Sequence, residues 1–267
     1  MERKLQFSSI GYCQLANNAA HQFAARHALV HYASGTVYTF IPKNACSTGR
    51  LSLAIANGCI GGPDDYNWIH SNNGTFTASL SELNRAEYAF VILRCPYARI
   101  ASVYLDKIVG HTPAAWQLLD VLMRDRDLND ISFDSFVRLL QRPGVRNSNI
   151  HWKPQVSFLV YQEYDDYFNL TELDAAAEVI RAKCGLELVD ARSLTRHGLD
   201  QVEFGVFENA HLMSPVDLLY AKSRGALPRP EDLYTEELIG LVRSAYSEDV
   251  ELIARLFGKD ALMFGEE

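Results

Sequence analysis

Hydrophobic positions follow two different periods in the first hundred residues of the chain. Residues 36–41 form a β-branched and aromatic run, which predicts a buried strand. Residues 42–49 are mostly small or hydroxyl-bearing, with one lysine, and apolar residues then recur at helical spacing from Leu51 to Ile55 before Gly58. The pattern therefore predicts a strand, a loop and a helix in succession.

A second strand is predicted at residues 88–93, where apolar and aromatic side chains stand together. Pro96 follows closely and suits the first turn of a helix. Between the two strands, residues 60–85 are rich in Gly, Asn, Asp and Ser and lack a sustained period. They predict an irregular connection with room for one short helix.

The rest of the chain carries signals for helix starts and stops. The starts are Thr112-Pro113, Ser132 before residues 133–141, Thr171 with Asp174, Thr235 and Ser247, and the stops are Gly185 and Gly258. These signals predict an α/β fold with a central parallel sheet flanked by helices and a helix-rich C-terminal half. In such a fold ligands bind where loops leave the carboxyl ends of the strands.

Length and composition fit a single domain over residues 1–267, because 48% hydrophobic and 22% charged residues can build one substantial core. No apolar run is long enough for a membrane span, and the N-terminus does not resemble a signal peptide, so we expect a cytoplasmic protein. The five cysteines include no CxxC pair, which favours reduced thiols over a disulfide framework or a zinc site, and we expect no metal.

The net charge of −8 argues against broad binding to nucleic acid, and we expect no nucleic-acid partner. It leaves room for a locally positive pocket, for which the candidates are Lys43, Arg50, Arg94 and Arg99. An acidic exterior gives no special attraction for highly charged polymers, so a smaller or less charged acceptor is slightly favoured. The oligomeric state is left open by the sequence.

The junction after the first strand has the features of an anion site. Free N–H groups and the positive end of the helix dipole favour an anion at a helix N-terminus. Lys43 adds a full charge, and the hydroxyls of Ser47 and Thr48 add hydrogen bonds. The Gly-Lys-Ser/Thr ending of nucleotide triphosphatase loops is missing, so this is not an ordinary ATP loop.

Residues 42–48 resemble the 5′-phosphosulfate loop of sulfotransferases that use 3′-phosphoadenosine 5′-phosphosulfate (PAPS). Arg94 with Ser102, eight positions later, resembles the 3′-phosphate motif of the same enzymes. His151-Trp152-Lys153-Pro154-Gln155 and the stretch 234–258 are similar to segments of the chondroitin-type carbohydrate sulfotransferases. Cys95 departs from the family, where an acidic residue is common at this position.

The resemblance implies a P-loop-NTPase-like sheet and transfer of a sulfuryl group from PAPS to a hydroxyl of a carbohydrate or sugar-containing metabolite. The product is adenosine 3′,5′-bisphosphate. Lys43 would then lie near the bridging oxygen of the bond that breaks. The residues implied in donor binding are Lys43, Asn44, Ala45, Cys46, Ser47, Thr48, Arg94, Ser102 and, from a weakly similar basic turn, Arg224.

A general base should accept the proton of the acceptor, and histidine has a suitable pKa. The preferred candidate is His70, because the heparan 2-O-sulfotransferase branch carries its catalytic histidine in a similar setting; a surface histidine is the alternative. His151 is second, with packing of a His-Trp pair as its alternative. His111 and the carboxylates Glu82 and Glu87 complete the candidates.

Two other functions remain open on the sequence. A kinase-like phosphotransferase would need a magnesium ligand and a fuller glycine-rich loop. A non-catalytic nucleotide-binding scaffold would keep the fold without turnover.

Overall fold

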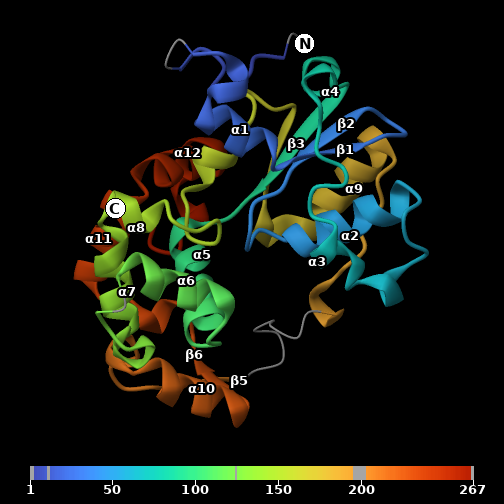
Figure 1. Cartoon of the computed structure of the whole chain (residues 1–267). Coiled ribbons are helices and arrows are strands. Elements are labelled where there is room, and N and C mark those ends of the chain that lie inside the picture. Colours follow the sequence, from blue (N-terminus) through green and yellow to red (C-terminus); the bar gives the residue numbers. More distant parts are fainter. Residues whose placement is uncertain (1–2, 11–12, 124, 195–202, 266–267) are drawn as a thin grey trace. The chain divides into compact units, whose positions relative to one another are not determined.

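The computed structural model describes residues 3–10, 13–123, 125–194 and 203–265. The chain divides into two compact units, one made of residues 1–93 and 155–196 and the other of residues 94–154 and 197–267 (Figure 1). Each unit is described by itself, and the single domain over residues 1–267 stays a prediction.

The first unit is built around a four-stranded sheet with the order β1-β2-β3-β4. β1 is antiparallel to β2, whereas β2, β3 and β4 are parallel, with Thr36 opposite Tyr88 and Phe90 opposite Asp166. The strands are β1 (Ala28–His31), β2 (Thr36–Thr39), β3 (Tyr88–Leu93) and β4 (Asp166–Asn169). The predicted α/β class with a mostly parallel central sheet is confirmed.

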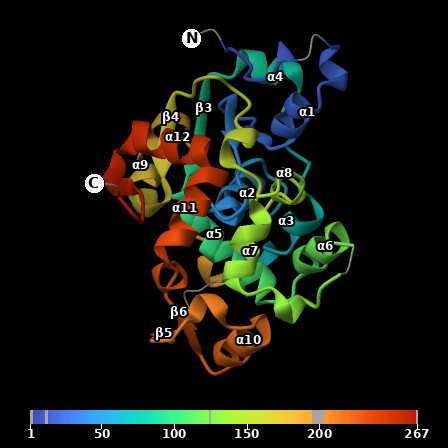
Figure 2. The ribbon, with the colours of Figure 1, turned by 90° about the vertical axis from the view of Figure 1, so that its left-hand side faces the viewer.

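Helices cover this sheet through an apolar core. Alternate residues of β2 and β3, among them Tyr38, Phe90 and Ile92, share one buried cluster with Leu53 of α2 and Ile180 of α9. Figure 2 shows α9 beside β4. The helices of the unit are η2 (Leu15–Asn17), α1 (Ala19–Ala25), α2 (Cys46–Ala56), η3 (Pro63–Asp65), α3 (Trp68–Ser71), α4 (Leu80–Arg85), η6 (Gln155–Phe158), η7 (Leu170–Glu172), α9 (Leu173–Cys184) and η8 (Arg192–Leu194).

Two predictions in this unit need correction. The connection over residues 60–85 holds η3, α3 and α4 rather than one short helix, and a capping box between Ser79 and Glu82 begins α4. Thr171 does not cap α9, because it lies in η7, where its N–H donates to Asn169 Oδ1 at 3.3 Å. The predicted stop at Gly185 is confirmed by its left-handed φ of 71°.

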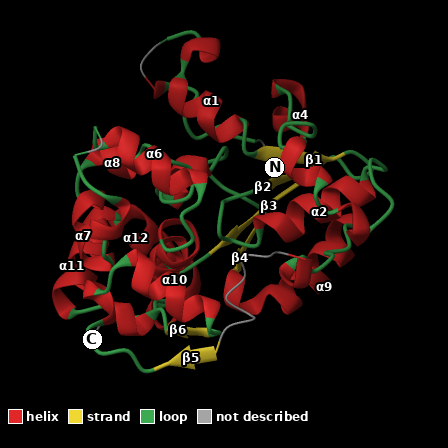
Figure 3. Cartoon of the chain, turned by 60° about the horizontal axis from the view of Figure 1, so that its bottom comes forward, coloured by secondary structure: helices red, strands yellow, loops and turns green. Residues whose placement is uncertain are grey.

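The second unit is mostly helical, which confirms the helix-rich C-terminal half (Figure 3). Its strands β5 (Glu203–Gly205) and β6 (Ala226–Pro228) form a small parallel pair. Its helices are α5 (Pro96–Val103), η4 (Tyr104–Ile108, a π-helical turn), α6 (Pro113–Val121), η5 (Leu128–Asp130), α7 (Phe133–Leu140), α8 (Pro143–Arg146), η9 (Ala210–Leu212), α10 (Pro215–Ser223), η10 (Glu231–Leu233), α11 (Glu236–Ala245), α12 (Ser247–Phe257) and η11 (Lys259–Ala261).

Two predicted helix caps of the second unit are confirmed by side-chain hydrogen bonds. Ser132 accepts from the N–H of Ser135 at the start of α7, and Thr235 accepts from the N–H of Leu238 at the start of α11. These two helices contact each other, and Arg138 of α7 pairs with Glu237 of α11 at 2.8 Å. Within the ranges that the structure describes, every helix is too short or too polar to cross a bilayer.

Candidate functional site

The loop between β2 and α2 has an unusual backbone. Lys43 and Ala45 both lie in the left-handed region, with φ of 72° and 54°. Each such non-glycine residue costs about 1–2 kcal/mol, so the surrounding structure must hold the loop in place. Ala45 is the N-cap of α2, and no side chain caps this helix end. The first-turn N–H groups of α2 therefore have no side-chain acceptor at the cap.

Asn44 holds this loop from inside the protein. Its side chain is fully buried, and Nδ2 donates to the carbonyl of Ile92 at 3.0 Å and to Gln155 Oε1 at 2.6 Å. Asn44 Oδ1 is buried without a hydrogen-bond partner among the residues described. Since Ile92 is in β3, the side chain ties the loop to the carboxyl end of the neighbouring strand. Contact of Asn44 with a ligand stays a prediction.

The first turn of α2 presents the predicted hydroxyl and thiol groups. Cys46 and Ser47 are half-buried, whereas Thr48 is buried and its Oγ1 accepts from the N–H of Ala191 at 3.2 Å. One turn later Ser52 Oγ accepts from the N–H of Val189 at 2.8 Å. Thr48 and Ser52 thus hold the segment around residue 190 against α2. Ser52 Oγ donates its own proton to the carbonyl of Thr48 at 2.7 Å, whereas the Thr48 hydroxyl still has one proton to donate.

Gly49 lets α2 approach the sheet closely. A Cβ atom at this position would lie 2.3 Å from Cε1 of Tyr38 in β2, and the Tyr38 ring stacks on Phe90 of β3 at 4.9 Å. The glycine is required by helix–strand packing, not by a positive φ. The signal that could have revealed this role was a glycine in the first turn of a helix that follows a strand with a large aromatic residue near its end.

Arg50 connects α2 to the short helix that carries His70. Its Nη2 donates to the carbonyl of Ile69, and its guanidinium lies over the ring of Phe40 at 5.7 Å from the ring centre. Burial lowers the pKa of Arg50. His70 itself is exposed at the end of α3, with its ring 5.1 Å from that of Tyr66. No sequence pattern predicts this link through Arg50, because its partner is the backbone carbonyl of a residue outside α2.

The second half of the predicted donor site begins the second unit. Arg94 directly follows the last residue of β3 and is half-buried. Cys95 is the N-cap of α5 and Pro96 its first residue, as predicted, and Ser102 lies buried two turns along. Cys95 Sγ accepts from the N–H of Met263 at 3.1 Å. The Cys95 thiol, at a position where an acidic residue is common in the family, therefore accepts a hydrogen bond from the backbone of its own unit.

Arg99 does not contribute to an open positive pocket. It is 1% exposed, and its guanidinium donates to the carbonyls of Lys153 at 2.8 Å and Ile150 at 3.4 Å. Because the guanidinium is buried, its charge is not available to an open pocket. Its hydrogen bonds instead hold the turn that carries His151. The expectation that Arg99 builds such a pocket was wrong.

His151 is oriented by an amide network. Its Nδ1 lies 2.7 Å from Asn149 Oδ1, and Asn149 Nδ2 donates to Gln117 Oε1 at 2.7 Å. The neighbouring Trp152 is completely buried and donates to the carbonyl of Val145 at 2.9 Å. An aromatic platform for an acceptor cannot be formed by this ring, so the packing alternative holds for Trp152.

The remaining candidates have distinct surroundings. His111 has a left-handed φ of 48°, and its Nε2 is buried with no hydrogen-bond partner in the described part of the chain. Glu82 accepts from the N–H of Ser79 at 2.7 Å in the cap of α4, and Glu87 is exposed. Arg224 is exposed after α10 and lies over the ring of Tyr220 at 5.8 Å.

The predicted site residues thus fall into two groups. Lys43, Ala45, Cys46, Ser47, Thr48 and His70 belong to the first unit, where Arg50 joins the loop helix to α3. The second unit holds Arg94, Ser102, His151 and Arg224. Among the residues described, no three His, Cys, Asp or Glu side chains gather to hold a metal. All five cysteines are free thiols.

Comparison with known proteins bears on this arrangement. Residues 26–254 match the profile of the sulfotransferase family. The chain is also similar to carbohydrate sulfotransferase 14 of Danio rerio, with 26% identity over 179 residues that make up 60% of this chain and 48% of that protein. The chain thus matches about half the length of this curated relative. No solved structure gave a significant match. Because the profile covers most of the chain, the protein belongs to the sulfotransferase family.

Proposed function

We propose that the protein transfers the sulfuryl group of PAPS to a hydroxyl of a carbohydrate or sugar-containing metabolite. The observation that carries the proposal is the uncapped N-terminus of α2, which follows a loop strained at Lys43 and Ala45 in a member of the sulfotransferase family. Strain that is held by buried contacts such as those of Asn44 is typical of a binding site. The relative named as a carbohydrate sulfotransferase supports the class of acceptor.

The loop would bind the 5′ side of the donor. The N–H groups of the first turn of α2 and the hydroxyls of Ser47 and Thr48 offer hydrogen bonds to the 5′ phosphate. As the sulfur–oxygen bond breaks, its electron pair stays on the bridging oxygen, which leaves as part of adenosine 3′,5′-bisphosphate. Lys43 stabilises the negative charge that develops there.

The start of α5 would bind the 3′ side. Arg94 brings a fork of donors and Ser102 a hydroxyl, and Arg224 is a further candidate from the turn after α10. Pro96 has no N–H to offer, so recognition at this helix start would depend on side chains.

His70 is the proposed general base. It would take the proton of the acceptor hydroxyl while the oxygen forms the new bond to sulfur, a contribution of about 10²–10⁴-fold to the rate. His70 is exposed, and Arg50 fixes the helix on which it lies. His151, whose ring contacts Asn149, is the second candidate.

Calorimetric titration with adenosine 3′,5′-bisphosphate tests the donor site. We expect tight binding that needs the 3′ phosphate, with ADP and AMP binding more weakly, and a loss of about tenfold or more in Arg94→Ala. Arg255→Ala is the matched control, because Arg255 is an exposed arginine of α12 in the same unit and lies outside the predicted donor site.

Equal affinity for all three nucleotides would overturn the PAPS assignment. Preference for ATP with magnesium would favour the phosphotransferase. Binding of the bisphosphate without any turnover of PAPS would favour the scaffold.

A further inference from the structure

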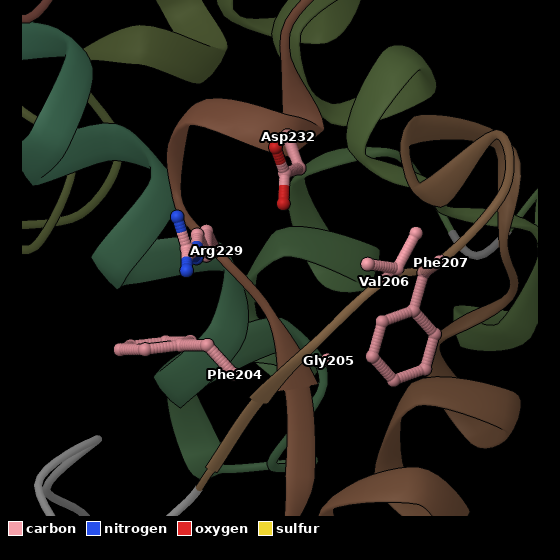
Figure 4. A pocket seen from close by; sticks show the side chains of 6 residues that line it. All are labelled: Phe204, Gly205, Val206, Phe207, Arg229 and Asp232. Carbon is pink, nitrogen blue, oxygen red and sulfur yellow. The ribbon is translucent and has the colours of Figure 1, made fainter.

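The second unit contains a hollow beside the small sheet, with a volume of about 450 Å³. It is lined by Phe204, Gly205, Val206, Phe207, Arg229 and Asp232. Figure 4 shows Phe204 and Arg229 on one side, Val206 and Phe207 on the other, Gly205 between them and Asp232 above. This volume lies in the range of small-molecule sites, roughly 300–1,000 Å³.

The hollow combines an apolar surface with two opposite charges. Phe204 is 46% exposed although it is a large aromatic residue. Within the described part of the chain, the side chains of Arg229 and Asp232 form neither a hydrogen bond nor an ion pair, with each other or with a third residue. Their positions are fixed through the backbone, since the N–H of Asp232 donates to the carbonyl of Arg229 at 3.1 Å.

Gly205 lies between the two sides of this hollow (Figure 4). A Cβ atom there would lie 3.2 Å from Cε2 of Phe207, which is tighter than ordinary contact. A side chain at this position would also occupy space between the two sides of the hollow (Figure 4). The glycine thus keeps open a surface bordered by an aromatic ring, a donor and an acceptor.

These features match the chemistry of a sugar ring. One face of a pyranose carries C–H groups that pack on an aromatic ring, while its hydroxyls both donate and accept hydrogen bonds. Arg229 can donate to a hydroxyl or ring oxygen, and Asp232 can accept from a hydroxyl. The carboxylate disfavours a phosphate or sulfate group in the same place, because like charges repel.

One element of the hollow contacts the helix of the predicted 3′-phosphate motif. η10, which contains Asp232, contacts α5. Just after η10, the hydroxyl of Tyr234 donates to the carbonyl of Tyr97 in α5 at 2.9 Å. A ligand beside η10 would therefore bind to an element that is fixed to the helix carrying Ser102.

We infer that this hollow binds one uncharged pyranose unit of the carbohydrate acceptor, with the sugar face on Phe204 and its hydroxyls bonded to Arg229 and Asp232. The inference rests on the proposed function in its choice of acceptor, but binding at the hollow does not require the sulfuryl donor.

Saturation-transfer NMR on the full chain without nucleotide tests this site. The probes are methyl α-glucoside, methyl β-galactoside and N-acetylglucosamine, with glycylglycine as a zwitterionic comparison. We expect transfer to the ring protons of at least one sugar, about tenfold weaker binding in Phe204→Ala and about threefold weaker binding in Asp232→Asn. Trp116→Ala is the matched control, because Trp116 is an equally exposed aromatic residue of the same unit outside the hollow.

Several results would overturn the inference. These are no transfer to any of the sugars, transfer that all three variants retain equally, or transfer to glycylglycine alone. Asp232→Asn preserves the shape of the turn and carries the test if Phe204→Ala fails to fold. Sugar binding without affinity for adenosine 3′,5′-bisphosphate would contradict the proposed donor site and leave the sugar site standing. Affinity for the bisphosphate without sugar binding would contradict the sugar site and leave the donor site standing.

Discussion

Two helix starts that follow neighbouring parallel strands are built in different ways. Neither helix has a side-chain cap, but α2 follows β2 through a loop with left-handed residues, whereas α5 follows β3 through Cys95 and begins with a proline. The start of α2 thus keeps all of its first-turn N–H groups without a side-chain cap, whereas Pro96 removes one N–H group at the start of α5. On the proposed function, we therefore expect backbone recognition of an anion at α2 and side-chain recognition, through Arg94, at α5.

The largest expected effect that tests this comparison is a loss of turnover in Lys43→Ala. If Lys43 stabilises charge on the leaving oxygen, removal of its ammonium group should lower kcat by about 10²–10³-fold, with a much smaller change in affinity for adenosine 3′,5′-bisphosphate. Steady-state kinetics and calorimetry on the same preparation measure both quantities. An unchanged kcat, or a fall in affinity as large as the fall in kcat, would contradict the assignment.

A smaller effect concerns the packing of α2 against β2. Gly49→Ala places a methyl group against Tyr38, and we expect it to lower the free energy of unfolding by about 1–3 kcal/mol. Gly240→Ala is the matched control, because Gly240 lies in the helix α11 and nothing stands within 4 Å of its added Cβ. The control should raise stability by about 0.5–1 kcal/mol. Urea unfolding measures both, and equal effects of the two substitutions would refute the close approach.

The smallest effect is a dependence of stability on pH in the first unit, which contains α2. Burial lowers the pKa of His21 and of His31 below the usual 6.5. The unfolded chain therefore binds more protons below about pH 6.5. Stability should be full above that pH and fall as pH decreases toward the lowered values.

Urea unfolding at pH 7.5, 6.5 and 5.5 checks this dependence. The double variant His21→Gln, His31→Gln should lose much of the slope between pH 6.5 and 5.5. A flat profile in the original chain, or an unchanged slope in the double variant, would show that the burial of these rings has no such cost.

Local patterns predicted the parts of the fold that depend on neighbours in sequence. The strands β2 and β3, the proline at the start of α5 and the stop at Gly185 follow from periodicity and backbone preferences. The missed helix α4 also had a local signal, the capping box of Ser79 and Glu82, which the composition of the connection obscured.

The contacts that shape the site join residues far apart in sequence. Asn44 meets Ile92, Gly49 meets Tyr38 and Arg50 meets Ile69, and none of these pairs follows from spacing. Arg99 is one of the candidates for a locally positive pocket, yet its guanidinium is buried and donates to carbonyl oxygens of its own unit. Tertiary partners, rather than residue type, decide these roles.

The hydroxyl of Thr48 has a consequence for amide exchange. Its oxygen accepts from the N–H of Ala191, and its proton can be donated to a different acceptor. An anion that accepts this proton would polarise the hydroxyl and strengthen its bond to Ala191, since chained hydrogen bonds reinforce one another. Exchange of the Ala191 amide proton with deuterium would then slow when the loop is occupied, so one amide far along the chain would report the binding of the donor.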